Sequence, residues 1–333
     1  MGTDDLPTPP APLSNAIPSA SAVSNNAATT HPSASEEVWT VQRILEWTTG
    51  FLKQKGIESP RLEAELLLSH ARQCQRIRLY TDFDAVVSDT ERSRMREMVQ
   101  RRAKREPLAY LVGSKEFYGR SFEVGKGVLI PRPETETLID VCLERLPRNE
   151  SRHIAEVGFG SGCISITLAK QCPQLTIQAT DPSPEAMHFA THNSSAHKVQ
   201  DRIQLVNGDC LLAFLPKNSS EGTAAGFTPS FDGIVSNPPY IRIDEMAALQ
   251  PEVGLHEPHE ALVSGEDGLD ITRRIIHQAT MILKPNAFIA FELDPAQCQT
   301  VESILRTTGF TATGIRKDLS GNDRVVFAEW PGQ

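Results

Sequence analysis

The chain has 333 residues, of which 39% are hydrophobic and 23% are charged, which is ordinary for a soluble globular protein of about two domains. Its net charge of −9 excludes general attraction of the whole molecule to nucleic acid, so such a partner would need a local basic patch. No apolar run reaches the ~18 residues that span a bilayer, and no membrane partner is expected.

Residues 1–37 are rich in Ser, Ala, Pro, Asn and Thr and have almost no large apolar side chains. Such a segment cannot bury enough surface to offset its chain entropy, so we expect a disordered tail. It contains no Lys or Arg, which argues against a secretory signal or an organelle transit peptide. The six cysteines show no C-x-x-C spacing, and together these features favour a cytoplasmic protein.

A helical pattern fills residues 38–112, and we expect a small all-helical N-terminal domain there. Apolar residues recur at helical spacing from Val41 until Gly56 ends the first helix. A second helix begins with Ser59 as its N-cap and Pro60 at its first position. A third begins at Ser88, where a Glu three residues later forms a capping box.

The third predicted helix contains the basic stretch "ERSRMREMVQRRAKR", residues 91–105. Charged runs of this kind are most often solvated helix faces. A docking surface for RNA or for an acidic partner is the alternative, and the acidic balance of the rest of the chain keeps it open.

Residues 113–136 have glycines at short intervals between aromatic and β-branched residues, as in a β-hairpin. They lead into "LIPRPETE", and we interpret the whole range as a hairpin connector between two domains.

Strands and helices alternate in the remaining domain, residues 137–333, which predicts a parallel sheet covered on both faces. The last two strands are separated only by "LSGN", which is too short for a crossover, so they must pair antiparallel. The fold class is therefore α/β, with a seven-stranded doubly wound sheet. Strands are expected at 153–158, 176–181, 202–209, 231–237, 287–294, 311–318 and 324–330, helices at 162–171, 184–195, 269–283 and 296–308, and a flexible surface loop at 217–230.

The motif "EVGFGSGC" follows the first of these strands and begins a helix. Gly158, Gly160 and Gly162 allow a tight turn and a close approach of the backbone to a ligand. The spacing is G-x-G-x-G and not the G-x-G-x-x-G of dinucleotide-binding folds, which argues against dinucleotide redox chemistry. Taken alone, the motif also fits a purely structural turn.

Two aspartates follow the next strands and are candidates for contacts to a nucleoside. Asp181 closes the second strand, where a carboxylate can accept both hydroxyls of a ribose. Its alternative role is to cap the helix near Pro184, which Ser183 fills better. Asp209 can accept from an adenine amino group, but an Asp in a strand-end turn is equally common.

The stretch "SNPPY" follows the fourth strand, at the same edge of the predicted sheet. The side-chain oxygen of Asn237 and the carbonyl of Pro238 can each accept one N–H of a planar NH2 group. The two prolines, Pro238 and Pro239, hold the backbone rigid, and Tyr240 offers a flat wall. A site with two acceptors and no nucleophile is suited to orienting a nitrogen atom.

Transfer of a methyl group from a sulfonium such as S-adenosylmethionine needs such a site, because alignment of the two reactants dominates its barrier. An amide nitrogen is a poor nucleophile, and accepting both of its hydrogens raises its electron density as the new bond forms. Asn237, Pro238, Pro239 and Tyr240 are therefore the candidate catalytic residues.

The stretches "SNPPYI", "EVGFGSGC", "VLIPRPETE", "EPLAYLVGSKEF" and "HEPHEAL" together resemble the HemK/PrmC family. These enzymes methylate the glutamine of the Gly-Gly-Gln loop in class I peptide-chain release factors. The resemblance covers residues 38–330 and implies a Rossmann-like class I methyltransferase sheet, S-adenosylmethionine as cofactor, and release factors as protein substrate. It also implies that the helical domain docks the substrate, that the protein is a monomer, and that it binds no nucleic acid stably.

The resemblance also assigns roles to individual residues. It implies that one set of residues holds the cofactor, namely Glu156, Gly158, Gly160 and Gly162 at the methionine end, with Asp181, Asp209 and Asn237. It implies that a second set holds the substrate amide, namely Asn237, Pro238, Pro239 and Tyr240, with Arg132, Pro133 and Glu134 as a wall of the pocket.

Two positions depart from the family pattern. Phe159 stands where the family often has Thr, which affects the packing of the cofactor, and Gly254 stands where a basic residue is frequent, which affects a substrate contact. The stretch "HEPHE", residues 256–260, has two histidines three apart with a proline between them, unlike the zinc motif H-E-x-x-H. We predict no metal.

Two other functions remain open from the residues. Asn-Pro-Pro-Tyr alone is shared with enzymes that methylate adenine or guanine amino groups on a flipped base, for which the basic helix would be the recognition element. A cofactor-binding scaffold without catalysis is the second alternative, although a scaffold has no need of a rigid acceptor pair beside the cofactor.

Overall fold

A computed structural model describes residues 38–215 and 230–332 of the chain, and those from Trp39 onward belong to one compact unit. The predicted tail, residues 1–37, lies outside these ranges, as does the predicted loop 217–230 apart from Ser230. Within the described ranges, no helix is long and apolar enough to cross a membrane.

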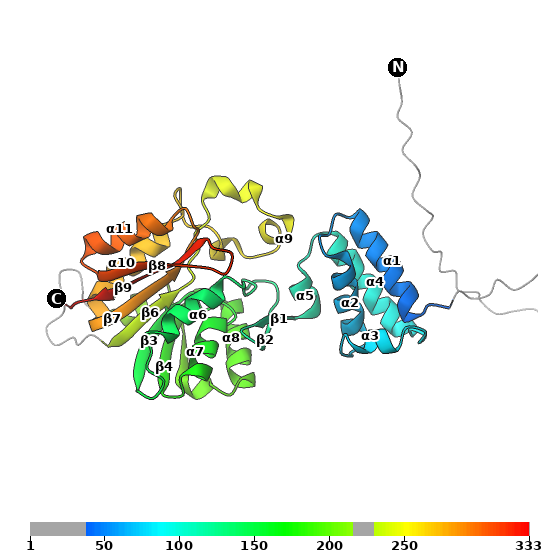
Figure 1. Ribbon diagram of the computed structural model, residues 1–333, viewed down its shortest axis with the longest axis horizontal. Helices are drawn as coiled ribbons and strands as arrows, with labels where there is room; N and C mark the ends of the chain where they lie inside the picture. Colours follow the sequence, from blue (N-terminus) through cyan, green and yellow to red (C-terminus); the bar gives the residue numbers. More distant parts are fainter. Residues whose placement is uncertain (1–37, 216–229, 333) are drawn as a thin grey trace, which may run out of the picture. The chain divides into compact units, whose positions relative to one another are not determined.

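The three helices predicted in the N-terminal part of the chain are present, with two short ones beside them (Figure 1). Their apolar faces form a core of their own, in which Leu45, Leu52, Leu68 and Val99 are buried. This core holds the bundle together, since burial of each such side chain is worth about 1.5 to 3 kcal/mol. The helices are α1 (Val41–Gln54), α2 (Pro60–Ala71), α3 (Arg78–Thr81), α4 (Asp89–Ala103) and α5 (Leu108–Val112).

The predicted capping box at the start of α4 is confirmed. The Ser88 hydroxyl accepts from the Glu91 backbone N–H at 3.3 Å, and the Glu91 carboxylate accepts from the Ser88 backbone N–H at 2.7 Å. Ser59 stands at the N-cap of α2 as predicted, but its side chain makes no capping hydrogen bond. Pro60, whose fixed φ suits the first turn, marks the start of that helix instead.

The predicted hairpin is formed by β1 (Ser114–Phe117) and β2 (Arg120–Glu123), which pair antiparallel. After it comes α6 (Thr135–Leu143), a helix that the interpretation of the sequence missed. Two prolines lie in the ten residues before it and masked its start, although Leu138, Ile139 and Cys142 recur at helical spacing and are fully buried. This helix brings Thr135 to the site described below.

The main sheet has seven strands, the number predicted from the sequence, and their order is β5-β4-β3-β6-β7-β9-β8. β3 to β7 run parallel, and β9 pairs antiparallel with both β7 and β8, which confirms the reversed last strand. The strands are β3 (Arg152–Val157), β4 (Leu175–Asp181), β5 (Ile203–Asn207), β6 (Phe231–Ser236), β7 (Leu283–Glu292), β8 (Thr311–Lys317) and β9 (Asp323–Trp330).

Helices cover both faces of this sheet (Figure 1). Successive residues of a strand point to opposite faces, so Ile154 packs with α6, α7 and α8, whereas its neighbour Ala155 packs with α10 and α11. These helices are α7 (Cys163–Gln171), α8 (Pro184–Ala196), α10 (Asp270–Ile282) and α11 (Cys298–Thr308). Shorter turns are η1 (Gln200–Arg202), η2 (Leu212–Phe214), η3 (Ile243–Ala248), α9 (Pro251–Gly254) and η4 (His259–Ala261).

Candidate active site

The order of the strands defines where a ligand belongs. The chain builds β4 and β5 on one side of β3 and then crosses to the other side for β6, so the connections diverge between β3 and β6. Ligands of doubly wound sheets bind beyond the carboxyl ends of the strands at such a point. Here the glycine-rich turn after β3 meets the Asn-Pro-Pro-Tyr loop after β6. A Cβ on Gly158 would stand 3.8 Å from the carbonyl oxygen of Asn237.

The glycine-rich turn needs its glycines for two physical reasons. Gly158, Gly160 and Gly162 have φ values of +75°, +50° and +80°, which L-residues with a side chain rarely adopt. Gly162 is the N-cap of α7, and a Cβ there would lie 3.0 Å from the side chain of Ile166 and 3.3 Å from that of Ala190. Gly158 and Gly160 line the cavity described next, whereas Gly162 supports the turn from behind.

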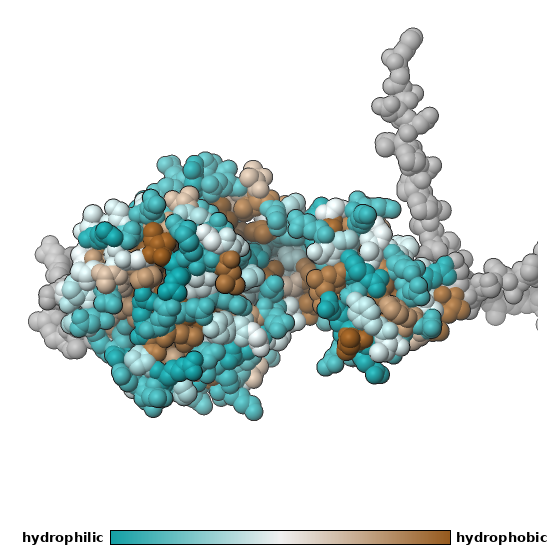
Figure 2. Space-filling view, in the orientation of Figure 1, coloured by the Kyte–Doolittle hydropathy of each residue, from teal (hydrophilic) through white to brown (hydrophobic). Residues whose placement is uncertain are grey.

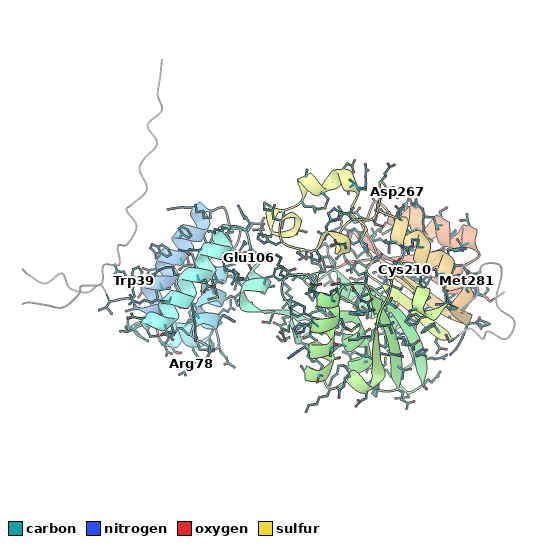
Figure 3. The ribbon with its side chains drawn as sticks, turned by 180° about the vertical axis from the view of Figure 1, so that it is seen from behind. Trp39, Arg78, Glu106, Cys210, Asp267 and Met281 are labelled. Carbon is teal, nitrogen blue, oxygen red and sulfur yellow. The ribbon has the colours of Figure 1, made fainter. Side chains whose placement is uncertain are left out.

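A cavity of about 670 Å³ opens at this edge of the sheet, a size typical of small-ligand sites. It lies between the ends of β3, β4 and β6, the connector before α6, and the segment after α9. Cys210, labelled in Figure 3, lies beyond the end of β5 on its wall. Of the residues predicted from the sequence, Arg132, Gly158, Gly160, Asp181, Asp209, Asn237 and Pro239 line it.

Asp181 lies in the wall of this cavity with its carboxylate held in place by the backbone. One oxygen accepts from the Gly160 N–H at 3.0 Å and the other from the Ser183 N–H at 2.9 Å. Burial raises the pKa of Asp181, and these two hydrogen bonds lower it. Each oxygen keeps a free lone pair for a ligand hydroxyl. Ser183, and not Asp181, caps α8, as the sequence suggested.

Asp209 also lines the cavity, but it carries an ion pair that the sequence did not suggest. Its carboxylate accepts a short hydrogen bond from the guanidinium of Arg274 on α10. This bond holds the pKa of Asp209 below its usual range, so the group is an ionised acceptor at neutral pH.

Glu156 lies apart from the cavity. It is fully buried in β3, and its Oε2 accepts from the backbone N–H and the hydroxyl of Ser165 on α7. Burial raises the pKa of Glu156 to about 8, and these hydrogen bonds only partly offset that effect. Its carboxylate therefore supports the turn from below, and its assignment to the cofactor stays a prediction.

Asn237 stands at the boundary between the large cavity and a second one of about 150 Å³. Its Nδ2 donates to the hydroxyl of Thr135 at 3.3 Å. The preceding residue, Ser236, ties the end of β6 to β3 through a hydrogen bond from its hydroxyl to the Val157 carbonyl at 2.8 Å. The loop is thus anchored at both sides, and the Oδ1 of Asn237 has no protein donor in the described ranges.

The smaller cavity is lined by Pro238 and Tyr240, whereas Pro239 faces the larger one. Burial raises the pKa of the Tyr240 phenol to about 12, so the ring is neutral and mostly apolar. The Tyr240 carbonyl accepts from the Gln297 side chain at 2.9 Å, which fixes the end of the loop.

The connector before α6 contributes Arg132, which lines both cavities. Its guanidinium pairs with Glu257, a buried carboxylate that also accepts from the Ile130 N–H at 3.1 Å. Pro133 and Glu134 are exposed at the start of α6 and line neither cavity. Their assignment to the pocket wall also stays a prediction.

Four residues of the site were missed by the sequence analysis. Thr135 bonds to Asn237, Glu292 ends β7 beside the Asn237 loop, and Glu257 holds Arg132. Ser161 lines the large cavity with a buried hydroxyl that has no hydrogen-bond partner in the described residues. The signal for Ser161 and Thr135 was available, because both lie inside motifs that were singled out, "GSG" and "RPETE". Glu257 also lies inside such a motif, "HEPHE", which was considered only for metal binding. Glu292 ends a predicted strand, and no residue spacing indicates its role.

The two departures from the family pattern lie in different places. Phe159 is buried and lines the large cavity, where its ring fills more space than the Thr that the family often has. Gly254 ends α9 outside both cavities, and a Cβ there would meet only ordinary contacts at 3.6 Å and beyond. His256 and Glu260 of "HEPHE" line the large cavity, and in residues 38–215 and 230–332 no three His, Cys, Asp or Glu side chains group closely enough to hold a metal ion.

Comparison with known proteins identifies the class. The model of the PrmC N-terminal domain matches residues 43–113, and that of the methyltransferase small domain matches residues 138–252. The fold is also that of the solved hMettl16 catalytic domain in complex with a MAT2A 3'UTR hairpin, with a TM-score of 0.50 and 17% identity over 75% of this chain and 85% of that one. The protein is a methyltransferase of the seven-stranded α/β class.

Relatives of higher sequence identity carry a more specific name. The chain is 41% identical to the release factor glutamine methyltransferase of Geobacter sulfurreducens, over 87% of this chain and 96% of that protein. It is 40% identical to the enzyme of the same name from Rhodopirellula baltica, over 86% of this chain and 95% of that protein. The chain belongs to the release factor glutamine methyltransferase family.

A methyltransferase needs a methyl donor, and the large cavity fits one with a nucleoside part. The glycine turn leaves room for close approach of a ligand to the backbone, and the Ser161 hydroxyl is a buried polar atom that lacks a partner. Asp181 adds a carboxylate with free lone pairs, which matches vicinal hydroxyls.

Proposed function

We propose that this protein transfers a methyl group from S-adenosylmethionine to the side-chain amide nitrogen of the glutamine in the Gly-Gly-Gln motif of class I peptide-chain release factors, and so supports translation termination. The observation that carries the proposal is Asn237, whose side chain lies at the boundary of a donor-sized cavity and a smaller one. Membership of the family supports the choice of substrate.

On the donor side, the residues of this chain would bind and orient S-adenosylmethionine. S-adenosylmethionine, when bound, supplies an electrophilic methyl group on a sulfonium. The Asp181 carboxylate would accept the ribose hydroxyls, since both of its oxygens are held by backbone N–H groups and keep free lone pairs. Asp209 would accept from the adenine amino group, and the turn at Gly158 and Gly160 would contact the methionine end.

On the acceptor side, the Oδ1 of Asn237 and the carbonyl of Pro238 would each accept one N–H of the glutamine carboxamide. These bonds strengthen as positive charge develops on the attacking nitrogen, so they stabilise the transition state more than the ground state. Tyr240 would pack against the flat amide, and Arg132 would bound the smaller cavity. No base is required at the barrier, because the proton leaves after the methyl group has transferred.

The helical N-terminal region, residues 38–112, would dock the release factor, while 113–136 connect it to the methyltransferase domain, 137–333. The surface of the helical region supports this role, as Figure 2 shows hydrophobic groups exposed on its visible face. Large apolar side chains that are exposed there are Val38, Trp47, Leu62, Ile77, Tyr80 and Val86. A release factor as substrate also favours a cytoplasmic monomer that does not bind nucleic acid stably.

The test is methyl transfer from labelled S-adenosylmethionine to a purified class I release factor. We expect transfer to the intact factor and none to a factor whose Gly-Gly-Gln glutamine is replaced by alanine. Asn237→Ala should lower kcat by about 100- to 1,000-fold, as for loss of one preorganised hydrogen-bonding group in other active sites. Asn322→Ala, in the exposed turn between β8 and β9, is the matched control and should leave kcat unchanged.

Other outcomes would replace the proposal. Transfer to RNA or DNA in the absence of any release factor would make the protein a nucleic-acid amino-methyltransferase. If Asn237→Ala bound the donor normally and complemented loss of the protein as well as the unchanged chain, the protein would be a scaffold.

A further inference from the structure

The two ends of the Asn237 side-chain amide have almost the same shape, but only one of them serves the proposed function. If Oδ1 faces the substrate, it accepts an N–H of the glutamine carboxamide. If Nδ2 faces the substrate, two donors oppose each other and the alignment is lost. Rotation of the amide by 180° would therefore remove the alignment that the reaction needs. Neighbouring groups of the protein must select the correct orientation.

Thr135 is the immediate partner that selects it. This residue is the first of α6, it is 2% exposed, and its Oγ1 lies 3.3 Å from the Nδ2 of Asn237. A hydroxyl can both donate and accept, so on its own Thr135 would tolerate either orientation of the amide. Its proton must be engaged elsewhere for the hydroxyl to act as an acceptor only.

Glu292 is placed to provide that engagement. It is the last residue of β7 and 1% exposed, and its carboxylate lies near enough to the Thr135 hydroxyl for that hydroxyl to lower its pKa. β7 pairs with β6 in parallel, with Ser236 opposite Phe291, so the residue after each of these is at the same edge of the sheet. One of the Glu292 oxygens, Oε2, is buried and has no hydrogen-bond partner within the described part of the chain. A buried carboxylate with an unpartnered oxygen is costly, which suggests a use beyond packing.

We propose that Glu292 and Thr135 are positioning residues, which fix the Asn237 amide with its oxygen toward the substrate. The Glu292 carboxylate accepts the Thr135 hydroxyl proton, the Thr135 oxygen then accepts from the Asn237 Nδ2, and Oδ1 is left for the glutamine N–H. Each bond in this chain sets the direction of the next. The inference rests on the proposed function, because it concerns the acceptor that this function requires.

This series of hydrogen bonds should depend on pH, because of the surroundings of Glu292. Burial raises the pKa of Glu292 to about 7, and the charge of Glu134 also raises it. The nearby Thr135 hydroxyl and the charges of Arg324 of β9 and of Arg132 lower it. Tyr240 and Cys163 also face it, and both are neutral near pH 7 because burial raises the pKa of each. Below about pH 7 the carboxyl gains a proton and can donate to Thr135, which reverses the chain. The rate should therefore fall as the pH decreases through about 7.

Thr135→Val keeps the shape of the side chain and removes the hydroxyl. We expect kcat for release-factor methylation to fall about 10- to 100-fold, the size seen when reacting groups are misaligned, with the KM for the donor changed less than twofold. Thr135→Ser keeps the hydroxyl and should retain most of the rate. Thr137→Val is the matched control on the same helix and should leave kcat unchanged. Equal losses in the Ser and Val variants, or a loss in the control, would overturn the inference.

Glu292→Gln offers an N–H to Thr135 in place of an acceptor-only group. We expect a lower kcat that no longer changes with pH between 6 and 8, whereas the wild-type rate should show its fall on the acid side. Glu329→Gln, an exposed change on β9, is the control and should keep the wild-type profile. A Glu292→Gln variant that retained the acid limb would overturn the inference.

A structural readout separates this inference from the proposed function. If the wild-type protein methylates no release factor, the proposed function fails, and the orientation of Asn237 can still be measured. The Nδ2 protons of Asn237, assigned in NMR spectra by their loss in Asn237→Asp, should exchange slowly in the wild type and in Thr137→Val. They should exchange at least tenfold faster in Thr135→Val. Equal exchange in all of these proteins would overturn the role of Thr135.

Discussion

Three buried carboxylates lie near the carboxyl ends of β3, β4 and β7, and each has a different environment. Asp181 accepts two backbone N–H groups at the cavity wall, Glu156 accepts from Ser165 beneath the glycine turn, and Glu292 has a buried oxygen without a hydrogen-bond partner in the described residues. Burial raises the pKa of all three. Hydrogen bonding decides how much of the desolvation cost remains, and it decides which of them are ionised at neutral pH.

Glu156 allows the cost of such burial to be measured. Its pKa is raised from 4.5 to about 8 in the folded protein. Between these values the unfolded chain has lost a proton that the folded protein retains, so the free energy of unfolding falls as the pH rises through this window. Each pH unit costs up to about 1.4 kcal/mol. Below about pH 4.5 both states are protonated, and the effect disappears.

The prediction is that Glu156→Gln removes this slope. Urea denaturation at pH 5, 6, 7 and 8 should show the stability of the variant rising relative to the wild type as the pH increases. The slope is the observable, because the new amide also changes the hydrogen bonds to Ser165 and shifts the absolute value. Glu116→Gln, an exposed change on β1, should run parallel to the wild type. Parallel curves for Glu156→Gln would contradict a raised pKa.

At the scale of elements, one arginine joins three of them. Arg102 of α4 is 5% exposed and donates to Glu63 of α2 at 2.6 Å and to Glu252 of α9 at 3.0 Å. Arg105 adds a second ion pair to Glu252 at 3.2 Å. α9 leads directly into the segment that lines the large cavity, so these pairs connect the helical bundle to the wall of the site.

Replacing Arg102 should therefore lower the free energy of unfolding substantially. Arg102→Met keeps much of the length of the side chain but leaves Glu63 without its guanidinium partner. We expect a loss of about 3 to 5 kcal/mol in the free energy of unfolding, as for other buried pairs broken on one side. Arg101→Met changes a partly exposed neighbour that pairs with Glu97 and Glu106, and it should cost only about 0 to 1 kcal/mol. Urea denaturation of both variants measures these losses in stability. Equal losses in the two variants would contradict the structural role of Arg102.

The elements show how far local patterns determine this fold. Alternating hydrophobic residues, the Ser88 capping box and the short "LSGN" connection act over a few residues, so the seven strands, their reversed member and the main helices were predictable. α6 was missed because the prolines before it outweighed a periodic pattern of only nine residues. Its first residue, Thr135, meets Asn237 from 102 positions away, and such long-range contacts leave no mark in residue spacing.

The same limit applies to the direction of side chains. The motifs correctly brought the glycine turn, Asp181 and the Asn-Pro-Pro-Tyr loop to one edge of the sheet. They could not show that the Glu156 carboxylate points beneath the turn, because a strand residue points to one face or the other according to the packing of the whole sheet. Nor could they show that Arg274 of α10 reaches Asp209, since that pair depends on how the helix packs on the sheet.

At the scale of the whole molecule, the large cavity couples ligand binding to stability. Its walls come from the connector, from β3, β4 and β6, and from the segment after α9, so a ligand in it contacts several parts of the chain that are far apart in the sequence. A ligand that binds only the folded protein stabilises it by mass action, by about 2.7 kcal/mol at a concentration 100 times its Kd. The unfolding temperature is therefore a direct measure of occupancy.

The last prediction uses this coupling to test the proposed donor site without any substrate. S-adenosylhomocysteine, the product that remains after methyl transfer, should raise the unfolding temperature of the wild-type protein by several degrees at saturating concentration. Asp181→Asn should lose most of that shift, because an amide offers one acceptor oxygen in place of the two that vicinal hydroxyls need. Asp201→Asn, an exposed change in η1, should keep the full shift. Since Asp181 also holds the Gly160 and Ser183 N–H groups, each variant is compared with itself without ligand, and an undiminished shift in Asp181→Asn would show that the nucleoside binds elsewhere.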